Sequence, residues 1–143
     1  MRKIVLAAVA FTFILVIHAC SKSSGTSSAK TMQNLSGSYN LTALTASYLG
    51  SSVSLYDSLP ACDKDNIIQL NSTGSAQFID AGTACVPPSD STGTWSLSSN
   101  ADTIYIAGNA SFIKSWDGKT LVLTNAEVVS GIPVTATSTL VKK

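Results

Sequence analysis

Apolar and polar residues alternate with a period of two through most of this chain, and this pattern limits its fold more than any other feature. Tyr39, Leu41 and Ala43 alternate with polar neighbours, and the pattern recurs at Trp95 and Leu97. Successive side chains of a strand point to opposite faces, so each run predicts a strand with one buried face. No apolar run of useful length with the helical period interrupts these segments. The pattern therefore predicts an all-β domain.

The alternating runs predict about eight strands joined by short turns. The turn "NSTG" and the Asp117–Gly118 pair in "WDGK" are suited to hairpins, and every connection after Gly93 is short. We expect an up-and-down antiparallel barrel in which the last strand pairs with the first, because closure removes exposed edges. A β-sandwich is the alternative. The expected strands centre on residues 39–43, 68–71, 76–78, 95–97, 104–106, 112–116, 121–123 and 134–140.

The beginning of the chain has the pattern of a secretory signal. A positively charged start precedes an apolar run over residues 4–17, which is shorter than the roughly 20 residues of a membrane span. The following residues resemble a bacterial lipobox, in which a cysteine receives the lipid, although the histidine is unusual there: Ile17, His18, Ala19 and Cys20. We therefore expect a lipoprotein signal peptide over residues 1–19 and a lipidated Cys20 carrying acyl chains such as palmitate. A plain signal peptide is the alternative.

The stretch "SKSSGTSSAKTMQ" after Cys20 is rich in serine and has little to bury. We expect residues 20–33 to form a flexible tether with an average span of about 20 Å, and residues 34–143 to form the domain. Lipid and tether together predict a protein of the bacterial cell envelope, anchored to the outer membrane. The absence of acidic residues directly after Cys20 favours the periplasmic face.

Loss of the signal peptide limits the chemistry of the mature chain. His18 is the only histidine, so histidine catalysis and histidine-ligated metals are excluded. Seven lysines then stand against eight acidic residues, without the basic stripe that nucleic acid requires. Asp57, Asp63, Asp65 and Asn66 lack the spacing of a calcium loop, and no nucleophile elbow occurs. We expect no enzyme activity, no metal and no cofactor.

Two cysteines remain when Cys20 carries the lipid. Cys62 and Cys85 are an even pair in an oxidising compartment, which favours a structural disulfide. Closing a loop of about 24 residues stabilises the fold by roughly 3 kcal/mol in the chain-entropy model.

Several segments resemble the lipocalin-like domain of small bacterial lipoproteins. These are "LSGSYNL", "LPACDKDNIIQLNSTG", the second cysteine, "GTWSL", "DTIYI", "FIKSW" and "KTLVLT", which together span residues 35–141. Gly37, Ser38 and Tyr39 depart from the glycine-x-tryptophan that begins the first strand in that family. The resemblance implies a short β-barrel related to lipocalins, anchored by lipid, and implies no single activity.

Two functions follow from such a barrel. In the first, a small apolar ligand fills an interior lined by Tyr39, Leu41, Phe78, Trp95, Ile104, Phe112 and Leu121, and rests against Trp95. The small residues Ala43, Ala76, Ala136 and Ser138 would leave room for it, and Ser138 or Gln77 would supply an inward polar group. In the second, these side chains fill the interior, and the domain is a packed non-catalytic scaffold that contacts an envelope protein.

Overall fold

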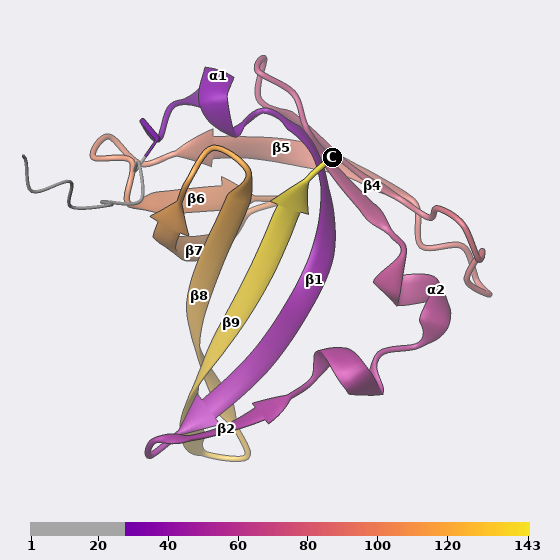
Figure 1. The fold of residues 1–143 in the computed structure, drawn as a ribbon, viewed down its shortest axis with the longest axis vertical. Coiled ribbons are helices and arrows are strands. Elements are labelled where there is room, and N and C mark those ends of the chain that lie inside the picture. Colours follow the sequence, from indigo (N-terminus) through magenta and orange to yellow (C-terminus); the bar gives the residue numbers. More distant parts are fainter. Residues whose placement is uncertain (1–27) are drawn as a thin grey trace, which may run out of the picture.

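The computed structural model describes residues 28–143, in which one antiparallel sheet closes on itself (Figure 1). The strands follow the order β2-β1-β3-β4-β5-β6-β7-β8-β9, and β1 also pairs with β9. Eight strands form the ring, while β2 lies outside it as an extra strand on β1. The expected all-β barrel is confirmed, and the pairing of β1 with β9 rules out the sandwich. The strands are β1 (Gly37–Tyr48), β2 (Ser51–Ser54), β3 (Ile67–Leu70), β4 (Ser75–Ile79), β5 (Ser91–Leu97), β6 (Thr103–Ile106), β7 (Asn109–Trp116), β8 (Thr120–Val129) and β9 (Ile132–Lys142).

Within residues 28–143, three short helical segments accompany the sheet: α1 (Met32–Leu35), the 3-10 helix η1 (Tyr56–Ser58) and α2 (Ala61–Lys64). The tether was expected to reach Gln33, but α1 begins at Met32 because Thr31 caps the helix and Met32 and Leu35 pack against the barrel core. The expected signal peptide, Cys20 and the tether up to residue 27 lie outside the described residues. Within the described part, no helix has the length and apolar character needed to cross a membrane.

Unequal strand lengths give the barrel a long side. β1, β8 and β9 have 12, 10 and 11 residues, whereas β3 and β6 have only 4 each. The excess length extends beyond the ring towards the bottom of Figure 1, where β2 joins it. We call this extension the ribbon: β2 with residues 45–48 of β1, 125–129 of β8 and 132–136 of β9.

Two irregularities change which residues face the interior. The pairing of β1 with β9 shifts between Leu41 and Ala43, and that of β7 with β8 shifts between Ile113 and Ser115. An extra residue in a strand reverses the alternation beyond it. Ala43, expected inside, therefore pairs with Thr139 on the outer face.

Phe112 was also expected inside, and this expectation is wrong. Its side chain is 53 % exposed, whereas Ile113 is buried and pairs with the buried Leu123. The inward residues of β7 are thus Ile113 and, beyond the shift at Lys114, Trp116.

The buried core fills the end of the barrel nearest α1. Its aromatic members meet there: the ring centroids of Tyr39 and Trp116 are 6.3 Å apart, and the Trp95 indole N–H donates to the Asn71 carbonyl at 2.7 Å. We call this region the closed half. The core residues are Leu35, Tyr39, Leu70, Ala76, Trp95, Ile104, Ile113, Trp116, Leu121, Leu123 and Leu140.

The expected disulfide joins Cys62 in α2 to Cys85 in the loop between β4 and β5. Acidic side chains hold the same loop by accepting backbone hydrogen bonds. Asp65 Oδ2 accepts from the Thr83 N–H at 2.8 Å, and the Asp80 carboxylate accepts from the N–H of Cys85. Asp65 was considered as a calcium ligand from the sequence, but in the structure its carboxylate orders the loop between β4 and β5.

Candidate ligand-binding site

The short helix α1 plugs one end of the barrel. Leu35 is fully buried, and its carbonyl accepts a hydrogen bond of 2.7 Å from the Tyr39 hydroxyl. Desolvation by burial raises the pKa of Tyr39 to about 12, so its hydroxyl remains a donor at neutral pH. Because α1 closes this end, a guest can approach the interior more easily from the opposite end.

That opposite end contains a hollow of about 320 Å³. Seven of its nine lining residues are apolar, and the other two are Asn109 and Ser138. The lining residues are Leu41, Leu44, Ile68, Phe78, Ile106, Asn109, Leu123, Ser138 and Leu140.

Strand register creates this space by placing a small residue between large ones. Ser138 lies on β9 between Leu44 of β1 and Leu123 of β8, and is directly paired with both. Its short side chain leaves room where a leucine would complete the core. The hollow thus follows from a serine at one inward position of β9.

Two polar groups lie within the apolar lining. Ser138 contributes a hydroxyl, as expected from the sequence. Asn109 begins β7 opposite Ile106, and its side-chain amide donates to the Ala107 carbonyl at 3.5 Å. Ligand pockets commonly combine apolar walls with a few polar groups that orient the guest. The site suits a mainly apolar molecule that carries a polar group.

The predicted lining residues divide among three places. Leu41 and Phe78 line the hollow. Phe112 lies outside the barrel. The remaining four point inward but belong to the closed half, where they are buried: Tyr39, Trp95, Ile104 and Leu121. Trp95 is not among the lining residues, so the expected contact between it and a guest is not supported.

Sequence reasoning missed six of the lining residues: Leu44, Ile68, Ile106, Asn109, Leu123 and Leu140. Four of these, Ile68, Ile106, Leu123 and Leu140, were already placed in alternating runs, so the signal for them was present. Leu123 and Leu140 belong both to the buried core and to the lining of the hollow. Leu44 became visible only with the shift in β1, which no sequence pattern announced.

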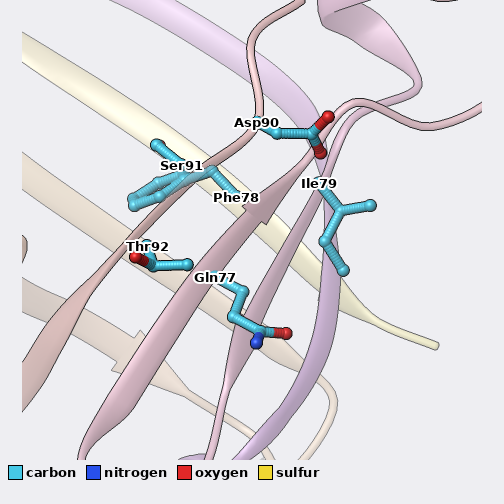
Figure 2. A pocket seen from close by; sticks show the side chains of 6 residues that line it. All are labelled: Gln77, Phe78, Ile79, Asp90, Ser91 and Thr92. Atoms are coloured by element: carbon cyan, nitrogen blue, oxygen red, sulfur yellow. The ribbon is translucent and has the colours of Figure 1, made fainter.

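A second hollow, of about 420 Å³, lies along the ends of β4 and β5 (Figure 2). Gln77 and Ile79 project from β4 away from Phe78, and Gln77 pairs with the exposed Thr92. Gln77 therefore faces outward, which corrects the expectation of an inward amide. With Asp90, Ser91 and Thr92 in its lining, this hollow is less suited to an apolar guest.

Fold and site together define a short closed β-barrel, plugged at one end and hollow at the other. A family model of the lipocalin-like domain matches residues 35–124, more than half of the chain, and the chain belongs to this family. The match ends within β8, so the strand that closes the barrel, β9, lies beyond it. Neither a curated protein nor a solved structure matches the chain.

Proposed function

We propose that this protein binds a small apolar molecule in the hollow opposite α1. The observation that carries the proposal is an apolar lining interrupted only by Asn109 and Ser138. At about 320 Å³, the hollow lies near the lower end of the 300–1,000 Å³ range of small-molecule sites. The guest is accordingly small, or only part of it enters the barrel.

The proposed role is binding rather than catalysis. None of the nine lining residues is titratable, so the hollow offers no general acid or base. This supports a carrier or sensor that holds its ligand unchanged.

The cell envelope is the proposed location, with a lipid on Cys20 holding the barrel at the periplasmic face of the outer membrane. The support comes from the sequence: a charged start, an apolar run of fourteen residues and a lipobox-like ending at Cys20.

Filling the hollow tests the ligand proposal. Ser138→Phe places a ring between Leu44 and Leu123, whereas Thr137→Phe adds the same ring at the neighbouring outward position. We expect the full chain to bind an apolar fluorescent probe saturably. Ser138→Phe should weaken this binding at least tenfold, and Thr137→Phe should leave it unchanged. Circular dichroism checks that both variants keep the sheet.

A scaffold that contacts another envelope protein is the second candidate function. Large apolar side chains exposed at the end of the ribbon favour it, among them Leu49, Val128 and Val129. Probe binding that is absent, or equal in the two variants, would contradict the ligand proposal and favour the scaffold.

A further inference from the structure

Charged side chains are distributed unevenly between the two ends of the barrel. Five of the six lysines within the described residues gather around α1, whereas Lys64 lies in α2. We call the α1 end the base. Its charged residues are Lys30, Lys114, Lys119, Lys142, Lys143, Asp102 and Asp117.

Hydrogen bonds hold several lysines of the base against α1 and the neighbouring strands. Lys142 Nζ donates to the Asn34 carbonyl in α1 at 3.1 Å, and the Lys142 N–H donates to the Lys119 carbonyl at 2.8 Å. Lys30 lies two residues before α1, and its Nζ donates to the carbonyl of Ile113 at 3.4 Å, next to Lys114. Lys143 follows Lys142 at the end of β9 (Figure 1).

The two acidic residues of the base are already engaged. Asp102 pairs with Lys30 at 3.3 Å. Asp117 Oδ1 accepts hydrogen bonds from the backbone N–H groups of Thr120 and Lys119, which lower the pKa of Asp117. Side-chain charges at the base sum to +3.

The remaining described residues carry the opposite charge. Lys64 is outnumbered there by six acidic residues, so their side-chain charges sum to −5. These acids are Asp57, Asp63, Asp65, Asp80, Asp90 and Glu127. An extended anionic partner would therefore be attracted to the base and repelled by the rest of the barrel.

The base also contains a recess of about 350 Å³, lined in part by Asn34, Trp116, Gly118 and Lys142. The Lys142 ammonium lies 5.8 Å from the centroid of the Trp116 ring. Trp116 is 3 % exposed, and its indole N–H has no hydrogen-bond partner among residues 28–143. A cation beside an unused donor suits a phosphate group.

We propose that the base docks on an anionic phospholipid surface, with a headgroup phosphate in the recess beside Lys142 and Trp116. The inference rests on the envelope location proposed above and is independent of ligand binding. The described chain begins at Ser28, which lines the same recess, so a tether from Cys20 would join the domain at this end. Docking leaves the hollow and the ribbon directed away from the membrane.

Hydrogen exchange of the full chain with vesicles tests the docking. We expect slower exchange at residues 114–120 and 142–143 with phosphatidylcholine vesicles that contain phosphatidylglycerol than with phosphatidylcholine alone. Raised salt should remove the difference. Each lysine near an anionic surface contributes about fivefold to binding. The exposed triple variant Lys114→Gln, Lys119→Gln, Lys143→Gln should therefore lose this protection, and Lys64→Gln should retain it.

Protection at the ribbon in place of the base would overturn the proposal, because the apolar end would then be the part that meets the lipid. Equal protection with both lipid mixtures, or unchanged protection in the triple variant, would overturn it as well. Measuring the intact mass of the chain distinguishes failure of the docking from failure of the lipid anchor. A chain without acyl groups that still shows lipid-dependent protection supports docking and contradicts anchoring.

Discussion

Tyr39 links the core of the barrel to the plug at its closed end. Its ring lies beside Trp116, and its hydroxyl donates to the carbonyl of Leu35 in α1. The side chain is fully buried, which raises the pKa of the hydroxyl to about 12. The position of α1 in the barrel therefore depends on the protonation state of the Tyr39 hydroxyl.

Replacing Tyr39 with phenylalanine should lower stability and change its pH dependence. The lost hydrogen bond is worth about 1 kcal/mol at pH 7. The folded pKa lies above the unfolded value of 10.0, so the stabilisation from the protonated hydroxyl is complete below pH 10 and is lost as pH rises towards 12. Urea unfolding should show that the free energy of unfolding falls more between pH 7 and pH 11 in the wild type than in Tyr39→Phe.

Tyr105→Phe is the matched control, since Tyr105 is an exposed residue of β6. It should behave like the wild type at both pH values. If Tyr39→Phe lost as much stability on going to pH 11 as the wild type, the raised pKa of Tyr39 would not be the cause.

At the scale of the elements, alternation and turn residues were sufficient to predict all eight strands of the ring and their order. They failed where a strand contains an extra residue. The shifts near Thr42 in β1 and Lys114 in β7 exchange inward and outward positions. The sequence did not predict them, because they arise from pairing with β9 and β8 rather than from local composition. β2 was also missed, because three of its four residues are serines and its alternation is weak.

The turn between β1 and β2 gives little sequence signal for a related reason. Leu49 and Gly50 have φ angles of 45° and 82°, the left-handed pair that a tight hairpin turn requires. Asparagine or aspartate usually occupies the first of these positions, whereas Leu49 is a large apolar residue with 86 % of its surface exposed.

Leu49→Asn should therefore stabilise the protein by about 1 kcal/mol, since asparagine tolerates the left-handed conformation better than leucine. Urea or thermal unfolding measures the change. Val53→Asn, an exposed position in the adjacent β2, is the control and should bring no such gain. An unchanged or lower stability of Leu49→Asn would show that Leu49 makes a compensating contact.

At the scale of the whole molecule, the barrel divides into a closed half and an open half. Large inward residues such as Trp95 and Trp116 fill the closed half beneath α1, while Ser138 leaves the open half hollow. The sequence predicted an apolar interior but not which part of it is filled and which part is hollow. The volume of the hollow depends on which side chains face one another across the ring. The packed interior expected of a scaffold and the cavity expected of a carrier thus both occur, in different halves of the same barrel.

A lipid on Cys20 would decide which of these halves faces the membrane, so its presence is the most informative property to measure. We expect Cys20 to be the acylated N-terminus of the mature protein, because a charged start and an apolar run precede the lipobox-like residues. Cys20→Ser should lose labelling with radioactive palmitate and stop fractionating with membranes at raised salt, where docking of the base is removed, and Ser21→Ala should keep both properties. Intact mass of the wild type gives the direct measurement, and a mature chain without lipid would contradict the anchor. If the anchor is present, we expect the tether to join the barrel at the cationic base and the hollow opposite α1 to stay accessible from the periplasm.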